Sequence, residues 1–153
     1  MSETVPEFDV RPMRAADEAA VLAFERENRA YFARFVSDRG DAFYERFSEG
    51  HQACLEEQEA GICVFHVLVD PDGAVLGRVN LYDLEYGSAT LGYRVAERVV
   101  GQGVTTEAVR RVARMAGRDY DRGPAGDQVR TRDLRHTDPS EAGPIRRTRV
   151  RRT

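Results

Sequence analysis

The sequence predicts an α/β fold of the α+β kind: a mainly antiparallel sheet flanked by helices, followed by an irregular Arg-rich C-terminal tail. Three observations predict it. Residues 62–69 form an almost continuous apolar run, residues 75–82 alternate after a Pro-Asp-Gly turn, and residues 89–116 pass from an alternating strand through a glycine turn into an amphipathic helix. A length of 153 residues suits one domain with a sizeable core.

The composition excludes several chemistries. All 23 basic residues are arginine, and 26 acidic residues give a net charge of -3. Without lysine, neither a P-loop nor a pyridoxal Schiff base can operate. Cys54 and Cys63 have no ligand or redox spacing, so we expect buried thiols in a reducing compartment. No apolar stretch approaches the roughly 20 residues of a membrane span, so we expect a cytoplasmic protein without membrane contact.

The first 61 residues predict one strand and two helices. Apolar and polar residues alternate over 8–13, which predicts a short strand. Its proline confines the strand to a sheet edge or places the proline at a strand end. Asp17 is expected to cap a helix that ends near Asn28. Apolar residues at turn-like intervals predict a second helix over 43–58, with Gly61 in the left-handed conformation after it.

Three neighbouring antiparallel strands are the simplest pairing in the centre of the chain. Residues 62–69 and 75–82 form a hairpin, and a polar loop over 83–87 leads to the third strand. One face of that strand carries Ala89, Leu91, Tyr93 and Val95.

The turn between the third strand and the following helix is a candidate anion site. Gly101 and Gly103 let the backbone approach a ligand closely, and the first turn of a helix leaves N–H groups unpaired at the positive end of its dipole. Glu107 should pair with Arg111 one turn on. The inward stripe of this helix contains Val104, Ala108, Val109, Val112, Met115 and Ala116.

The pattern stops after Tyr120. Residues 121–153 contain few large apolar residues and carry about +4 of charge by counting, so they predict a tail of low order beyond a domain over 1–120. Residues 129–134 are the only strand candidate there. The arginines over 146–153 offer charge to RNA or a ribosome without aromatic residues to read bases.

Residues 8–119 resemble the GNAT acyltransferases, and within them the ribosomal-protein N-acetyltransferases of the RimJ/RimL type. The resemblance lies in Val-Arg-Pro-Met at 10–13, the Val-Leu-Gly-Arg-Val-Asn-Leu strand at 75–81, Ala-Thr-Leu-Gly-Tyr-Arg-Val at 89–95, and Gly-Gln-Gly-Val-Thr-Thr-Glu-Ala at 101–108. A dinucleotide-binding fold is excluded, because it would require a parallel strand before the turn and a third small residue where this chain has Thr106.

The resemblance implies transfer of an acetyl group from acetyl-CoA, as co-substrate, to a primary amine by direct attack in a ternary complex. In the family, backbone amides of a Gln/Arg-x-x-Gly-x-Gly/Ala loop hold the pyrophosphate. Val100 and Thr105 depart from this pattern, whereas Gly103 matches it. The implied cofactor-binding residues are Tyr93, Arg94, Val95, Val100, Gly101, Gln102, Gly103, Val104, Thr105 and Thr106.

The transfer requires a base, an oxyanion donor and an acid. Glu85 is the nearest candidate base, although a loop carboxylate is more often solvated surface, and a main-chain N–H near Val95 could stabilise the oxyanion. Relatives often have an acid where this chain has Thr90. Tyr93 could supply a catalytic hydroxyl, but its alternation favours a core position. The three histidines, His51, His66 and His136, have no metal-ligand spacing, so we expect no metal.

The family's second half is not recognisable in this sequence. It would supply a further strand, an Asn-x-x-Ser-like helix and a closing hairpin. Because the sequence changes abruptly after Tyr120 to Arg, Pro and Gly with few aliphatic residues, we hypothesise a frameshift near codon 119 or 120. Two functions stay open: an amine acetyltransferase acting on a protein N-terminus or a small amine, as monomer or homodimer, and a catalytically inactive acyl-CoA-binding or RNA-contacting remnant.

Overall fold

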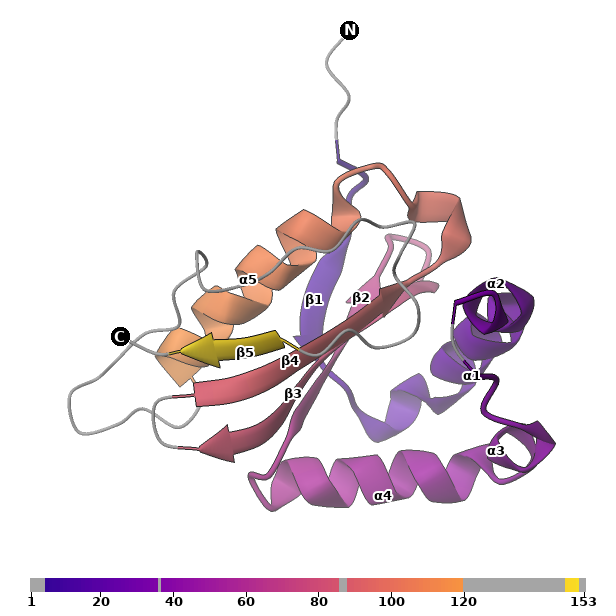
Figure 1. Cartoon of the computed structure of the whole chain (residues 1–153), viewed down its shortest axis with the longest axis horizontal. Helices are drawn as coiled ribbons and strands as arrows, with labels where there is room; N and C mark the ends of the chain where they lie inside the picture. The colour runs from indigo at the N-terminus through magenta and orange to yellow at the C-terminus, as the bar shows by residue number, and fades with distance from the viewer. Residues whose placement is uncertain (1–4, 36, 86–87, 120–147, 152–153) are drawn as a thin grey trace, which may run out of the picture.

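The fold is built on one antiparallel sheet. The computed structural model describes residues 5–35, 37–85, 88–119 and 148–151. Five strands lie in the order β1-β2-β3-β4-β5, each antiparallel to its neighbour (Figure 1). They span Asp9–Pro12 (β1), Val64–Val69 (β2), Val75–Glu85 (β3), Ser88–Val95 (β4) and Thr148–Arg151 (β5). The predicted fold class, edge strand and central hairpin are confirmed.

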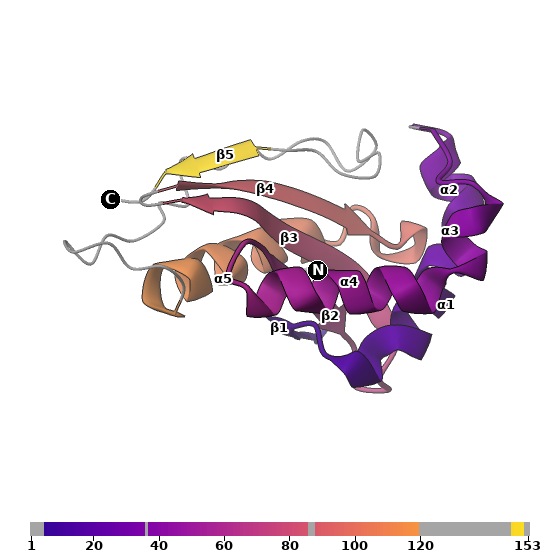
Figure 2. The same cartoon turned by 90° about the horizontal axis from the view of Figure 1, so that it is seen from below.

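Helices cover both faces of this sheet. Figures 1 and 2 show α5 on one face and α1 and α4 on the other. Among the described residues, no helix combines the length and apolar character needed to cross a bilayer. The helices span Ala15–Asp17 (η1), Glu18–Glu27 (α1), Arg29–Ala33 (α2), Asp41–Glu45 (α3), Phe47–Glu59 (α4), Glu97–Val99 (η2) and Val104–Asp119 (α5).

Asp17 does not cap α1, which corrects the sequence-based expectation. Its carboxylate instead accepts two hydrogen bonds of 2.7 Å from the Arg11 guanidinium and one of 2.8 Å from the Arg14 N–H. The hydrogen bonds from Arg11 are the main reason that the pKa of Asp17 lies below its usual value. A bidentate guanidinium therefore holds the carboxylate that the pattern assigned to the helix.

The second predicted helix is divided in two. Arg46 has φ -108° and ψ 27°, outside helical geometry, so α3 ends before it and α4 begins after it. Periodicity could not show this break, because apolar residues continue across it. The expected end at Gly61 is confirmed: its φ is 79°, and it donates to the Gln58 carbonyl while Ile62 donates to the Glu57 carbonyl.

The boundaries of the later strands also differ from the prediction. The expected loop over 83–87 is shorter, because β3 continues to Glu85 and pairs there with Ser88. Thr148–Arg151 forms a strand within the segment expected to be irregular. The candidate strand over 129–134 lies outside the described residues, so the domain boundary at residue 120 and the frameshift stay predictions.

The two sheet faces have different interiors. On the α5 side, Leu81, Leu91, Tyr93 and Val95 are at most 2% exposed, and five of the six residues predicted for the inward stripe of α5 are buried. Met115 is half-buried. Burying this apolar area holds α5 against the sheet at about 25 cal/mol per Å².

The opposite face buries a charged triad. Arg78 and Arg94 lie directly opposite each other on β3 and β4, an arrangement that is repulsive by itself. Glu25 of α1, fully buried, lies between them: its Oε1 is 3.2 Å from Arg78 Nη1 and its Oε2 is 2.8 Å from Arg94 Nη1. Arg94 also stacks over the Phe32 ring at 4.5 Å. One carboxylate thus joins α1 to both central strands.

Replacing Glu25 by Gln should destabilise the fold strongly. The change leaves two buried guanidinium groups without a neutralising charge, and breaking a buried pair in this way costs about 3–5 kcal/mol. Denaturant unfolding of the purified variant measures the loss. Glu27→Gln, on the exposed side of the same helix, is the matched control and should change the free energy of unfolding by less than about 0.5 kcal/mol. A mild effect of Glu25→Gln would contradict the structural role of the triad.

His66 should make stability depend on pH between about 6.5 and 4. Burial lowers its pKa to about 4, while its hydrogen bond with the Val79 carbonyl opposes that shift. Below about pH 6.5 the unfolded chain binds a proton that the folded chain does not bind, so the free energy of unfolding falls by roughly 2 kcal/mol from pH 7 to pH 5.

The slope of the unfolding free energy with pH, compared between the parent chain and His66→Gln, tests this expectation. The variant should lose most of the slope in that window, whatever its absolute stability. An unchanged slope would assign the pH dependence to other groups.

Candidate functional site

A glycine turn joins the sheet to α5. After η2, Gly101 has φ 80° and Gly103 has φ 83°, the left-handed region that L residues rarely adopt. A Cβ on Gly103 would also lie 3.1 Å from Val5 Cγ2. The two glycines therefore let the chain reverse within a few residues and bring its backbone to the surface at the start of α5.

The start of α5 presents backbone N–H groups. The first N–H groups of an α-helix have no intrahelical acceptor. Within α5 the Glu107 N–H is the first to bond back, to the Gly103 carbonyl at 3.1 Å, while in the turn before it the Gln102 N–H donates to the Val99 carbonyl at 3.3 Å. Gln102 is exposed and donates its side-chain amide to the Arg98 carbonyl. Val104 and Thr105 are buried, whereas Thr106 is exposed. This arrangement suits a phosphate oxygen, because N–H groups and helix dipole both favour negative charge.

The outer edge of β4 is only partly paired. β5 pairs with Ser88 to Leu91, and within the described residues no strand pairs with the outer edge of Gly92 to Val95. This edge leads directly into η2 and the glycine turn. An extended ligand could therefore lie along the backbone of β4 and reach the start of α5.

The predicted site residues of β4 and its neighbours occupy different environments. Tyr93 is 1% exposed among apolar side chains, which confirms the core position. The Arg94 side chain is engaged by Glu25 and Phe32. Val100 is half-buried and donates its N–H to the Glu97 carbonyl. The side chain of Glu85 lies outside the described part of the chain, so its role stays a prediction.

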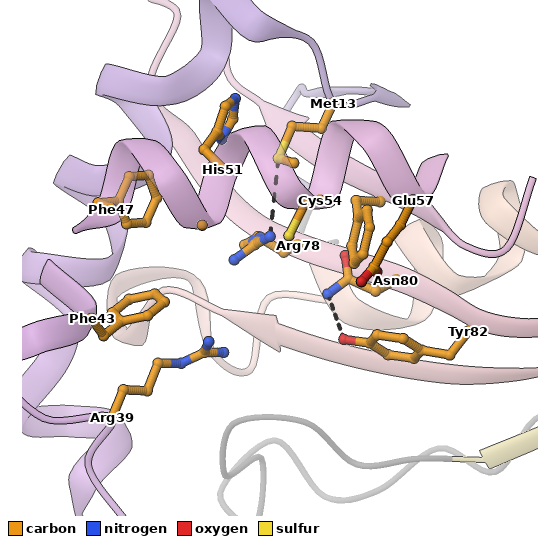
Figure 3. A pocket seen from close by; sticks show the side chains of 12 residues that line it. Met13, Arg39, Phe43, Phe47, His51, Cys54, Glu57, Arg78, Asn80 and Tyr82 are labelled. Atoms are coloured by element: carbon orange, nitrogen blue, oxygen red, sulfur yellow. Dashed lines mark hydrogen bonds between the residues drawn. The ribbon is translucent and has the colours of Figure 1, made fainter. Parts of the chain in front are cut away.

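A pocket opens on the opposite face of the sheet, between α4 and β3. We call it the Arg78 pocket, and its volume is about 280 Å³. Figure 3 shows Arg78 and Asn80 at its base on β3, with Arg39 and Phe43 at one end and Glu57 and Tyr82 at the other. The remaining lining residues are Met13, Phe47, Gly50, His51, Cys54 and Phe65.

Two buried polar atoms at the base of the pocket have no hydrogen-bond partner among the described residues. They are Arg78 Nε, a donor, and Asn80 Oδ1, an acceptor. The Asn80 amide nitrogen donates to Tyr82 Oη at 3.0 Å, and Arg78 Nη2 meets the Met13 sulfur at 4.0 Å. Buried polar atoms are normally paired, so these two indicate a site for a polar ligand.

The other titratable groups of the pocket are constrained. His51 contacts the Arg14 carbonyl at 3.0 Å and stacks on Phe47. Burial raises the pKa of the Cys54 thiol, with Arg78 opposing the shift, so the thiol stays protonated near neutral pH. His136 lies outside the described residues. Across the described ranges, no three His, Cys, Asp or Glu side chains gather to hold a metal ion.

Sequence reasoning did not identify Glu25, Arg78 or Asn80 as buried groups. A glutamate on an amphipathic helix normally faces solvent, and alternation showed only that Arg78 and Asn80 share a face. The available signal was the adjacent strand over 62–69, which is apolar on both faces and so predicts a covered sheet.

Comparison with known proteins shows what the chain is similar to. A probable N-acetyltransferase of Bacillus subtilis (strain 168), YjcK, is 32% identical over 112 residues, covering 67% of this chain and 60% of that protein. The chain thus spans about three fifths of the length of this curated relative.

Similar solved structures include three enzymes. Ribosomal-protein-S5-alanine acetyltransferase from Vibrio fischeri has a TM-score of 0.66 and 19% identity over 71% of this chain and 63% of its own. Spermidine N-acetyltransferase from Vibrio cholerae, in complex with CoA and spermine, has a TM-score of 0.55 and 15% identity. The match covers 71% of this chain and 63% of that one. Mycobacterium smegmatis RimJ, in complex with CoA-disulfide, has a TM-score of 0.59 and 18% identity. The match covers 95% of this chain and 81% of that one. At these identities the likeness shows the fold.

A family model provides the decisive match. The acetyltransferase (GNAT) domain model matches residues 8–130, which is most of the chain and includes the hairpin, the glycine turn and α5. The resemblance seen in the strand and loop motifs is therefore confirmed, and the chain belongs to the GNAT acetyltransferase family.

Proposed function

We propose that the chain transfers an acetyl group from acetyl-CoA to a primary amine. The observation that carries this proposal is the placement of the Gly101–Gly103 turn between the partly paired edge of β4 and the N-terminus of α5. An extended anionic ligand fits this path, because backbone groups along it can bind the ligand's arm and its phosphates without a lysine.

Specific residues would hold the cofactor. The backbone of Tyr93, Arg94 and Val95 would bind the pantetheine arm along the outer edge of β4. The residues of the turn and the first helical turn would hold the pyrophosphate: Val100, Gly101, Gln102, Gly103, Val104, Thr105 and Thr106. The N–H groups of Val100 and Gln102 already donate to the Glu97 and Val99 carbonyls, so the donors would be the N–H groups of the other five residues. The positive φ at Gly101 and Gly103 supports this assignment. Thr105 is 9% exposed, so its side chain lies largely in the interior.

Acetyl-CoA supplies the acetyl group as a thioester, and this chain's residues must prepare the amine. Glu85, at the end of β3, is our candidate base, and the main-chain N–H near Val95 is the candidate oxyanion donor. The protonated Cys54 thiol favours direct attack by the amine over an acyl-cysteine route. In this proposal, residues 1–120 form the catalytic domain and residues 121–153 an Arg-rich tail.

The alternative is a catalytically inactive protein that binds acyl-CoA or contacts RNA. It is favoured by Thr90, where relatives often have an acid, and by the unrecognised second half of the family's sequence. The acceptor in our proposal is a small amine or a protein N-terminus. The relatives described above carry both kinds of name, a spermidine and a ribosomal-protein acetyltransferase.

Two measurements separate these functions. Calorimetric titration of the full chain with acetyl-CoA tests for cofactor binding, and release of free thiol with a panel of amines tests for transfer. Binding with thiol release supports the enzyme, and binding without release supports the inactive protein. A Kd of about 1 mM corresponds to a binding free energy near -4 kcal/mol. Absence of binding at millimolar acetyl-CoA would contradict both the enzyme and the acyl-CoA-binding form.

Thr106→Glu should stabilise the fold and weaken acetyl-CoA binding at the same time. Thr106 is exposed in the first turn of α5, where an acidic side chain gains about 0.3–1 kcal/mol from the helix dipole. The same charge would repel a bound pyrophosphate, and we expect the Kd for acetyl-CoA to rise about 5- to 10-fold.

Thr106→Gln is the matched control, since it has nearly the shape of Glu without the charge. It should leave the Kd within about twofold of the parent chain. If Thr106→Glu raises the melting temperature but leaves the Kd unchanged, the pyrophosphate does not bind at this helix end.

A further inference from the structure

We propose that the Arg78 pocket binds the acetyl acceptor and that this acceptor is an amine that also carries a carboxylate. That the ligand is an acetyl acceptor rests on the proposed acetyl transfer. The chemistry of the ligand, an amine with a carboxylate, is inferred from the pocket alone. The groups that face the pocket are cationic at Arg39 and Arg78 and anionic at Glu57, with His51 held by a backbone carbonyl.

One edge of the Arg78 guanidinium is available for a planar anion. Its Nη1 binds Glu25, Nη2 meets the Met13 thioether at 4.0 Å, and the Cys54 thiol also lies within hydrogen-bonding reach of the guanidinium, while Nε has no geometric hydrogen-bond partner among the described residues. The N–H groups of Nε and Nη2 point the same way from a planar guanidinium and form the fork that accepts a carboxylate through two hydrogen bonds. Glu25 holds the other end of the group, so the fork is fixed in place.

A hydrogen-bond acceptor lies next to Arg78 on the same face of β3. Asn80 follows Arg78 by two residues on the same face, about 7 Å away along the strand. Its Oδ1 is a buried acceptor without a partner among the residues described, and Figure 3 shows Glu57 at this end of the pocket, near Tyr82. A ligand ammonium would satisfy Asn80 Oδ1 and face the Glu57 carboxylate.

This orientation brings the amine toward the proposed cofactor path. Asn80 pairs in register with Gly92 of β4, and the outer edge from Gly92 to Val95 is the one assigned above to the pantetheine arm. Because Gly92 carries no side chain, none stands on this face between Asn80 and that edge. The carboxylate on Arg78 would thus place the amine at the end of the pocket where transfer takes place.

The pocket limits the size of the ligand. Its volume of about 280 Å³ lies just below the range of about 300–1,000 Å³ typical of small-molecule sites. Its walls include the rings of Phe43, Phe47, Phe65 and Tyr82, so an aromatic or apolar body fits beside the two charges. A free amino acid and an acidic residue at a protein N-terminus share this chemistry.

The first test compares two probes that differ only in the carboxylate. L-phenylalanine and phenethylamine are titrated into the full chain by NMR, each with and without saturating CoA. We expect L-phenylalanine to bind at least about tenfold more tightly, the ratio that a charge-assisted bidentate pair supplies. Equal affinities, or no binding of either probe at millimolar concentration, would overturn the inference.

Two substitutions locate the binding in the pocket. Arg78→Lys keeps the charge beside Glu25 but lacks the fork, so the preference for L-phenylalanine should fall at least about fivefold. Gly50 of α4 lines the pocket and has open space where a Cβ would stand, so Gly50→Leu should fill the pocket and abolish binding of both probes.

Matched controls separate occlusion from misfolding. Gly50→Ala, and Gln52→Leu on an exposed position of the same helix, should bind L-phenylalanine as the parent chain does. Binding by a folded Gly50→Leu variant that equals the parent's would place the ligand elsewhere. Acetyl-CoA affinity is measured on every variant, so loss of cofactor binding reports on the proposed function and not on the pocket.

A final arm distinguishes the two sources of the ligand. Aspartyl-alanine amide and asparaginyl-alanine amide present an N-terminus with and without a carboxylate. Tighter binding of the aspartyl peptide than of L-phenylalanine identifies a protein N-terminus, and the reverse order identifies a free amino acid. Either order supports recognition of a carboxylate only when the compound with the carboxylate binds more tightly than its matched partner without it, and equal binding within both pairs contradicts the inference.

Discussion

The buried ion triad of Glu25, Arg78 and Arg94 is the constraint on which the rest of the structure depends. Two guanidinium groups facing each other across neighbouring strands would repel, and removing them from water is costly. A single carboxylate from α1, at 3.2 and 2.8 Å from them, offsets both effects. Such a cluster contributes little net stability compared with apolar packing, but it admits one position of α1 against β3 and β4. The position of the helix is therefore set by charge as well as by shape.

The triad also shapes the pocket beside it. Glu25 occupies one end of the Arg78 guanidinium, which leaves the Nε atom without a hydrogen-bond partner among the described residues, next to Met13 and Cys54. Arg94, on the far side, is covered by the Phe32 ring, and burial lowers its pKa to about 10 while Glu25 opposes the shift. It stays charged at neutral pH. Two arginines with one glutamate leave an excess of positive charge in the triad, of which Arg78 lines the pocket.

Local pattern was sufficient for the elements that repeat a single period. The strands over 62–69 and 75–82, the glycine turn and the α5 stripe all follow from residues within one segment, and the structure confirms them. The cap by Asp17 and the continuous helix over 43–58 were predicted wrongly, since periodicity shows neither a competing arginine nor a local change of backbone angle. The pocket was not predictable for a stronger reason: it joins residues from Met13 to Tyr82, and only their contacts in three dimensions bring them together.

The outer edge of the sheet links the cofactor proposal to the topology. Exposed strand edges invite pairing with other chains, so proteins normally cover or charge them. β5 covers Ser88 to Leu91, and its sequence, Thr-Arg-Val-Arg, carries two arginines, which discourage further pairing at its own free edge. Within the described residues no strand pairs with the outer edge of Gly92 to Val95, although all four residues are buried. The proposed acetyl-CoA path would use the backbone groups of this stretch where it leads into the glycine turn, and the Gly92–Asn80 pairing would place the stretch beside the proposed amine end of the Arg78 pocket.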